Sequence, residues 1–193
     1  QKQFPSLLII DRLDVTDHSQ IDQLAEKYST IAIDVLLNNA GISGDTKNQI
    51  FGTMNYDVYH KVLAVNTIGP LKMAEAFYPH VKASEQKKII TVSSSEGSIA
   101  TADKRGGGRL FFYRSSKSAL NMVMVNLALQ LKSRGVAVGM INPGATDTDF
   151  MTGLPIPLRK TEVAVSDMIR NIDSITVENT GAYLNYNGKT VPW

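Results

Sequence analysis

Residues 113–122 read YRSSKSALNM, and this stretch begins an amphipathic segment that continues to about Arg134. In an α-helix, Tyr113 and Lys117 would lie one turn apart on the same face. A free tyrosine has a pKa of about 10 and is a poor base near neutral pH, but a nearby ammonium group favours its phenolate. Such a tyrosine could pass a proton to or from a carbonyl or alcohol oxygen. Alone the pair is a weak signal, because a tyrosine and a lysine at this spacing usually do no more than share a helix face.

Five short apolar segments with the character of strands are distributed along the chain. They are residues 7–15, 33–37, 88–92, 136–141 and 182–186. The segments between them repeat apolar residues at helical spacing, at 21–28, 57–81, 113–134 and 162–172. Strands that alternate with helices favour right-handed βαβ units and a parallel sheet covered on both faces. The sequence therefore predicts an α/β protein with a Rossmann-like, doubly wound parallel sheet. Pro70 is expected to kink or divide the long helix at 57–81.

Small polar residues follow four of these predicted strands. They are Asp14, Asn38 with Asn39, Ser93 with Ser94, and the turn at 142–144. In an open parallel sheet, the ligand crevice lies outside the carboxyl ends of the strands. Four polar strand ends in succession therefore predict a ligand site along this edge.

Composition and charge exclude several classes of function. The 193 residues have a net charge of +2 with both signs mixed along the chain, which indicates neither a nucleic-acid nor a membrane surface. The absence of cysteine excludes disulfides, thiolate metal sites and a cysteine nucleophile. His18, His60 and His80 are scattered, so no metal site is predicted. The length favours one domain over residues 1–193.

Targeting signals are also missing from the sequence. No apolar run approaches the ~18 residues of a membrane span, and the N-terminus lacks the pattern of a signal peptide. A cytoplasmic location is therefore expected. Because the chain does not begin with Met, it could be a piece of a longer one.

Several of these residues occur in an order that resembles the classical short-chain dehydrogenase/reductase family. The matching pieces are Asp14-Val15, Asn38-Asn39-Ala40-Gly41, Asn66, Ser94 with Gly97, Tyr113 with Lys117, and Pro143-Gly144 with Thr148. The ordered set covers nearly the whole chain and is far more specific than any single motif. The form of the motif at 113–117, the glycine-rich loop at 105–108 and the ending at 181–193 look like the carbonyl-reductase-like branch.

The resemblance implies an oxidoreductase that transfers a hydride between a nicotinamide cofactor and a small-molecule carbonyl/alcohol substrate. Tyr113 would be the general acid/base. Lys117 would lower the pKa of Tyr113 and hydrogen-bond the nicotinamide ribose. Ser94 would hydrogen-bond the substrate oxygen and stabilise the developing alkoxide.

The remaining catalytic assignments also follow from the resemblance. Asn66 would complete the catalytic set by holding the helix geometry and a water that links Lys117 to solvent. Ser93 and Ser95 are local alternatives to Ser94, which is preferred because Gly97 follows it three residues later.

The implied cofactor is NAD or NADP, with no preference indicated. Residues at the first predicted strand end would flank adenine, those after the second would lie along the cofactor, and those after residue 141 would contact the nicotinamide. Together with Tyr113 and Lys117, these residues are Asp14, Val15, Asn39, Ala40, Gly41, Pro143, Gly144, Thr146 and Thr148. The family often has an aliphatic residue at the place of Thr146. The apolar segment at 151–158 occupies the place of a substrate lid.

One part of the family pattern is not found in the sequence. The family begins with a strand and a glycine-rich turn that holds the cofactor pyrophosphate at a helix N-terminus. No G-x-x-x-G-x-G occurs here, and residues 7–15 correspond to the third strand. The expected fold therefore lacks the first strand–helix–strand unit and exposes a hydrophobic sheet edge.

This gap leaves a second interpretation open beside the enzyme. The chain could be a truncated, non-catalytic homologue that acts as an oligomeric scaffold or a regulatory partner. Under either interpretation, the family implies a homodimer or homotetramer, formed through the helices that contain Asn66 and Tyr113.

Overall fold

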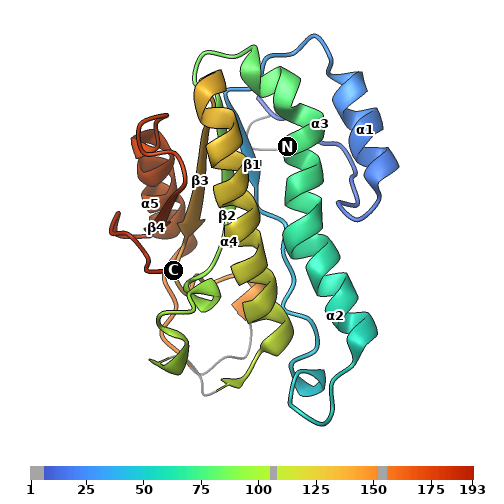
Figure 1. The fold of residues 1–193 in the computed structure, drawn as a ribbon, viewed down its shortest axis with the longest axis vertical. Helices are drawn as coiled ribbons and strands as arrows, with labels where there is room; N and C mark the ends of the chain where they lie inside the picture. Colours follow the sequence, from blue (N-terminus) through green and yellow to red (C-terminus); the bar gives the residue numbers. More distant parts are fainter. Residues whose placement is uncertain (1–6, 105–107, 152–155) are drawn as a thin grey trace.

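The computed structural model describes residues 7–104, 108–151 and 156–193 (Figure 1). Its helices and strands, in chain order, are α1 (His18–Lys27), β1 (Val35–Asn38), α2 (Tyr56–Leu63), η2 (Ala64–Ile68), α3 (Gly69–Lys82), β2 (Lys88–Val92), α4 (Phe111–Leu131), β3 (Ala137–Asn142), α5 (Thr161–Ser174) and β4 (Ala182–Asn185). Short 3₁₀ turns join them at η1 (Thr46–Asn48), η3 (Ser95–Gly97), η4 (Ala102–Lys104), η6 (Lys132–Arg134) and η7 (Asp149–Met151). Within these ranges, no helix is long and apolar enough to cross a bilayer.

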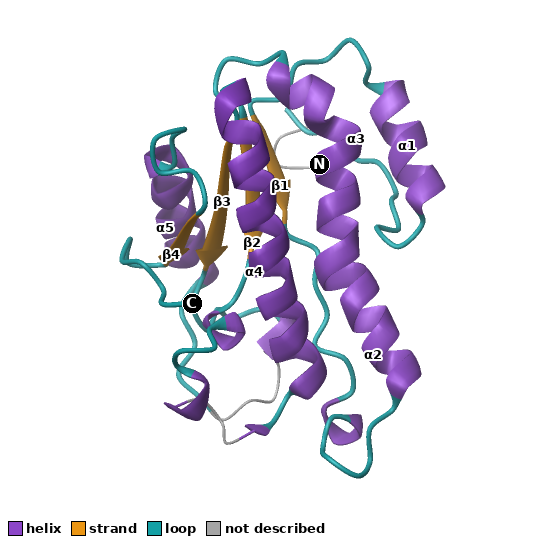
Figure 2. Cartoon of the chain, in the orientation of Figure 1, coloured by secondary structure: helices purple, strands orange, loops and turns teal. Residues whose placement is uncertain are grey.

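The four strands form a parallel sheet in the order β1-β2-β3-β4. Helices α3 and α4 lie side by side over one face with α1 outside α3, and α5 lies on the other face (Figures 1 and 2). Alternate strand residues face the two layers, as the pleat of a strand requires. Residues Ile89, Val138 and Met140 belong to the cluster with α3 and α4, whereas Ile90, Ala137 and Ile141 belong to the cluster with α5. The predicted doubly wound parallel sheet is confirmed.

The long predicted helix at 57–81 is divided, as expected. A π-helical turn, η2, separates α2 from α3, and the Gly69 N–H donates to the carbonyl of Ala64, five residues earlier. Pro70 follows directly in the first turn of α3, and because it has no N–H the regular ladder of helical hydrogen bonds is interrupted there. The turn buries Val65, Asn66 and Thr67 against the rest of the protein.

The strand predicted at residues 7–15 is wrong. Residues 8–14 have no regular secondary structure, and Leu7 and Ile9 are 76% and 80% exposed. A strand requires a neighbour for its hydrogen-bond ladder, and the doubly wound order 3-2-1-4-5-6 separates a third strand from a fourth by two others. Across the described residues, β1 is an edge strand, and Leu37 on it is 41% exposed. The expected exposed hydrophobic edge is therefore present.

Candidate active site

The N-terminal turns of α4 bring Tyr113 and Lys117 to the carboxyl end of the sheet. The Lys117 Nζ atom lies 5.8 Å from the centroid of the Tyr113 ring. Lys117 is only 4% exposed, and its Nζ donates a 2.8 Å hydrogen bond to the carbonyl of Val92 at the end of β2. Among the described residues, no carboxylate forms an ion pair with it. Lys117 is therefore a buried ammonium group whose hydrogen-bond acceptor is an uncharged backbone carbonyl.

Ser94 follows β2 and faces the same turn of α4. Its Oγ accepts the N–H of Glu96 at 3.2 Å and so caps the N-terminus of η3. The Ser94 side chain is also hydrogen-bonded to the side chain of Tyr113. The neighbouring Ser93 is 2% exposed and donates to Asn121 Oδ1 at 2.6 Å. Ser93 is therefore held in the core, whereas Ser94 lies beside the phenol.

Burial determines the protonation of this pair. It raises the pKa of Tyr113 to about 12, and the hydrogen bond with Ser94 acts in the opposite direction. It lowers the pKa of Lys117 to about 8. The net pKa of Tyr113 is therefore raised rather than lowered, because loss of water around the phenolate is the largest effect. A lowering effect of Lys117 on this pKa stays a prediction. Near neutral pH, Tyr113 is a protonated donor and Lys117 is charged.

Asn66 links the segment after β1 to α4 from within the π-helical turn. It is fully buried, and its Nδ2 donates to the Ile42 carbonyl at 2.8 Å and to Ser116 Oγ at 2.9 Å. Its Oδ1 accepts the Ile42 N–H at 2.9 Å. A Cβ atom placed on Gly41 would lie 3.5 Å from Asn66 Oδ1 and 3.7 Å from Lys117 Nζ. Gly41, Asn66 and Lys117 therefore meet at one place.

The expected adenine side of the site is a cavity at the end of β1. It has a volume of about 220 Å³ and is lined by Leu13, Val15, Leu37, Asn38, Asn39, Ala40, Pro70 and Met73. Asp14 lies next to it, exposed, and its carboxylate accepts the N–H and the hydroxyl of Thr16 at 2.9 and 2.7 Å. These hydrogen bonds lower the pKa of Asp14. Val15, Asn39 and Ala40 thus share one cavity, with Asp14 at its side.

The segment after β3 forms the other side of the site. Gly144 has a φ of +75°, which turns the chain, and the Pro143 carbonyl accepts a 2.7 Å hydrogen bond from Arg159 Nη1. Thr146 Oγ1 donates to the Gly144 carbonyl at 3.2 Å. Thr148 is exposed, and its hydroxyl donates to the carbonyl of Thr146 at 3.3 Å. Within the described residues, the hydroxyls of Thr146 and Thr148 form hydrogen bonds only to carbonyls of residues 143–146, and none to Ser94 or Tyr113.

Phe150 brings the chain back to Tyr113, with ring centroids 5.6 Å apart. Much of the segment predicted as a lid, and most of the glycine-rich loop at 105–108, lie outside the described residues.

Arg114 has more contacts than its sequence position suggests. Its side chain is only 13% exposed, although it carries a charge and no catalytic role is assigned to it. Its Nε lies 3.5 Å from Glu96 Oε2, and its Nη2 donates to the carbonyl of Ala102 at 2.9 Å. Arg114 therefore ties the turns after Ser94 to α4. Sequence periodicity could not reveal this, because those turns cover a helix face that would otherwise meet solvent.

Comparison with known proteins agrees with this geometry. The family model for short chain dehydrogenase matches residues 3–156. The 1-hydroxy-2-glutathionyl-2-methyl-3-butene dehydrogenase of Rhodococcus sp. is 31% identical over 94% of this chain and 78% of its own length. The C-signal protein of Myxococcus xanthus is 32% identical over 88% of this chain and 98% of its own length.

Solved structures give the same result in three dimensions. The NADPH-bound carbonyl reductase from chicken fatty liver has a TM-score of 0.87 and 28% identity, covering all of this chain and 79% of that one. The carbonyl reductase Sniffer of D. melanogaster has a TM-score of 0.83 and 26% identity, covering 95% and 77%. The chain belongs to the short-chain dehydrogenase/reductase family. Its similarity to these two structures supports the classical, carbonyl-reductase type.

Proposed function

We propose that this chain catalyses hydride transfer between NAD or NADP and a small carbonyl/alcohol substrate, within a single domain of residues 1–193. The observation that carries the proposal is the protonated phenol of Tyr113, hydrogen-bonded to Ser94 and one helical turn from the buried ammonium of Lys117. Nicotinamide binding by two of the similar structures, which contain NADPH and NADP, supports the choice of cofactor.

The residues present fit the nicotinamide end of such a cofactor. Lys117 is a buried cation without a carboxylate partner among the described residues, and a ribose hydroxyl would give it a further acceptor. Val15, Asn39 and Ala40 line an open cavity that suits the adenine side. Asp14, Gly41, Pro143, Gly144, Thr146 and Thr148 complete the proposed contacts. When bound, the reduced cofactor supplies the hydride to the carbonyl carbon.

The protein supplies the proton and the electrostatic stabilisation. As negative charge develops on the substrate oxygen, the Ser94 hydroxyl donates a hydrogen bond to it, and Tyr113 transfers its phenolic proton to the same oxygen. The resulting phenolate is stabilised by the nearby ammonium of Lys117. Asn66 keeps the segment at Gly41 against α4, so that these groups stay aligned. In the alcohol oxidation, the same proton returns to Tyr113.

The test is cofactor binding followed by turnover. Titration with NADH and NADPH, monitored by nicotinamide fluorescence, should saturate for at least one of them, and a panel of aldehydes and ketones should then be reduced. Tyr113→Phe should abolish turnover while changing the cofactor Kd little. Tyr56→Phe, at a tyrosine that is 64% exposed on α2, is the matched control. Retained turnover in Tyr113→Phe would exclude this mechanism.

One observation favours a second candidate function, a non-catalytic partner or scaffold. The C-signal relative matches over 98% of its own length, and its name denotes a signal rather than a catalyst. A folded, monodisperse chain that binds neither cofactor would support this alternative.

We also propose a homodimer or homotetramer in the cytoplasm. Apolar residues exposed on α4 and near the start of α3 support self-association, including Met122 at 62% and Leu71 at 41% exposure. Light scattering after gel filtration tests the oligomeric state, and a monomer at all concentrations would contradict it.

A further inference from the structure

Gln49 is a buried amide that no part of the proposed mechanism uses. It follows η1 and is only 1% exposed. Its Nε2 donates to the carbonyls of Ser43 at 2.7 Å and Asp45 at 3.3 Å. Its Oε1 accepts the N–H groups of Phe112 at 3.0 Å and Tyr113 at 3.3 Å. A glutamine side chain has two donor hydrogens and two acceptor lone pairs, so all four positions are occupied.

Helix α4, whose first N–H groups donate these hydrogen bonds, has no capping side chain immediately before it. The first N–H groups of an α-helix have no partner within the helix, and a Ser, Thr, Asp or Asn immediately before it usually accepts them. Here the preceding residue is Leu110, in the left-handed conformation at φ 61°, and an aliphatic side chain cannot accept a hydrogen bond. Gln49, 63 residues before Phe112, supplies the missing acceptor.

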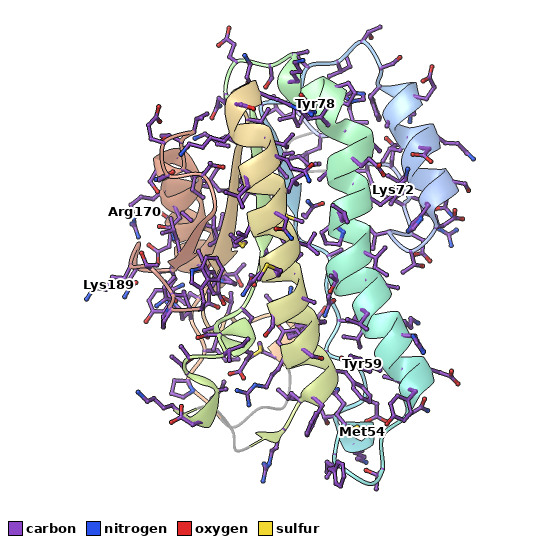
Figure 3. The ribbon with its side chains drawn as sticks, viewed as in Figure 1. Met54, Tyr59, Lys72, Tyr78, Arg170 and Lys189 are labelled. Carbon is purple, nitrogen blue, oxygen red and sulfur yellow. The ribbon has the colours of Figure 1, made fainter. Side chains whose placement is uncertain are left out.

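The same first turn is also fixed from α2. Tyr59 extends from α2 towards the start of α4 (Figure 3), where its hydroxyl donates to Ser115 Oγ at 2.8 Å. Its ring stacks on Phe112 with centroids 4.6 Å apart and planes 13° from parallel. These contacts hold side chains, whereas Gln49 holds the backbone of Phe112 and Tyr113. Gln49 therefore has a separate effect, on where the helix begins.

Gln49 also connects α4 to the segment that follows Gly41. Asn66 joins this segment to α4 at Ile42 and Ser116, and Gln49 joins it at Ser43 and Asp45. Two buried amides thus connect the same short segment to the first two turns of α4. The segment after Gly41 is therefore linked to the backbone of Tyr113 through Gln49 and to Ser116 through Asn66.

We propose that Gln49 is a positioning residue for Tyr113. It sets the first turn of α4, and through that turn it holds the phenol beside Ser94 and in register with the segment at Gly41. The inference deepens the proposed function, because it takes Tyr113 as the proton donor.

The first test measures amide hydrogen exchange in the full chain by NMR and needs no activity. Gln49→Met keeps the length of the side chain but removes both donors and acceptors. Exchange at Phe112 and Tyr113 should rise about tenfold or more, as expected for one lost hydrogen bond each. Gln130→Met, on an exposed position of α4, is the control and should leave both amides unchanged. Unchanged exchange in Gln49→Met would overturn the proposal.

Gln49→Glu separates the acceptor function of residue 49, towards Phe112 and Tyr113, from its donor function, towards Ser43 and Asp45. Its carboxylate can still accept from Phe112 and Tyr113 at the helix N-terminus, but it meets the carbonyls of Ser43 and Asp45 without a donor. Protection of the two amides should therefore return to within about threefold of wild type, since a carboxylate is a good cap. If Gln49→Met does not fold, this variant and Gln49→Ala carry the same test. Equal exchange in Gln49→Glu and Gln49→Ala would then overturn the proposal.

The second test is a comparison of kcat, KM and cofactor Kd. Gln49→Met should lower kcat by about ten- to hundredfold, because a small misplacement of a reacting group is costly, while the cofactor Kd stays within about threefold. A wild-type chain without turnover would count against the proposed function, yet the exchange experiment would still decide the role of Gln49. Turnover by wild type with an equal kcat in Gln49→Met would refute the positioning role and leave the function intact.

Discussion

Gly97 lies so close to Lys117 that a Cβ atom at residue 97 would come within 2.8 Å of the Lys117 carbonyl carbon and 2.9 Å of its Cβ. The Lys117 carbonyl carbon belongs to the backbone and the Lys117 Cβ is bonded to it, so neither atom can move aside as the end of a flexible side chain could. This contact lets the turn after Ser94 lie directly on α4. Ser94, three residues before Gly97, lies on the same turn.

Gly97→Ala should therefore destabilise the protein by about 1 to 3 kcal/mol, the usual effect of overpacking, and should weaken turnover by displacing Ser94. Gly41→Ala is the matched comparison, because a Cβ there would meet its nearest atoms at 3.5 and 3.7 Å, which is ordinary contact. Urea unfolding of the two variants measures the difference. Equal free energies of unfolding would show that α4 can shift to accept the methyl group.

Lys117 should make stability depend on pH in an identifiable window. Its pKa is about 8 in the folded state and near 10.5 when unfolded, so between these values the unfolded chain binds more protons. Stability should then rise with pH from about 8 to 10.5, by about 3 kcal/mol at most. Lys117→Met should lack this rise, whereas Lys82→Met, at an exposed position of α3, should retain it. Chemical unfolding across this range is the measurement, and identical pH profiles for wild type and Lys117→Met would contradict the assignment.

The phenol of Tyr113 should lose its proton at a higher pH than an ordinary tyrosine. Its pKa is raised to about 12 from an ordinary value of 10.0, so its proton is lost from the unfolded chain before the folded one. The stability that it contributes is complete below pH 10 and declines as pH rises towards 12. The difference in tyrosinate absorbance between wild type and Tyr113→Phe should have a midpoint near 12. A midpoint near 10 would mean that the phenol is as hydrated as a free one.

Asn66→Ala should lower the free energy of unfolding by about 2 to 3 kcal/mol, because it removes the partner of the partly buried N–H and carbonyl of Ile42 and one of the two hydrogen bonds of the Ser116 hydroxyl. The control is Asn126→Ala on an exposed position of α4, where replacement should be nearly neutral or slightly stabilising. Thermal unfolding compares the two. If Asn66→Ala were as stable as Asn126→Ala, water would have to replace all three hydrogen bonds. The link from Gly41 to α4 would then not depend on Asn66.

Much of the fold could be predicted from local sequence. The segment at 88–92 is a strand and 113–134 is a helix because their apolar residues recur with the period of the element that they form. Pro70 marks the division of the long helix because proline has no N–H wherever it lies. The polar residues Asn38, Ser94 and Asn142 share one edge because parallel strands end together.

The sequence by itself determined the strands from β1 onwards, the helices and the residue types at the edge of the sheet, since these follow from periodicity and side-chain chemistry. Only the tertiary structure decided the rest. Residues 7–15 are not a strand, because a strand depends on a neighbour. The pKa of Tyr113 is raised rather than lowered, because burial outweighs the effect expected from Lys117. Gln49 holds α4 from 63 residues away, a contact that no local pattern records because the chain must first fold to create it.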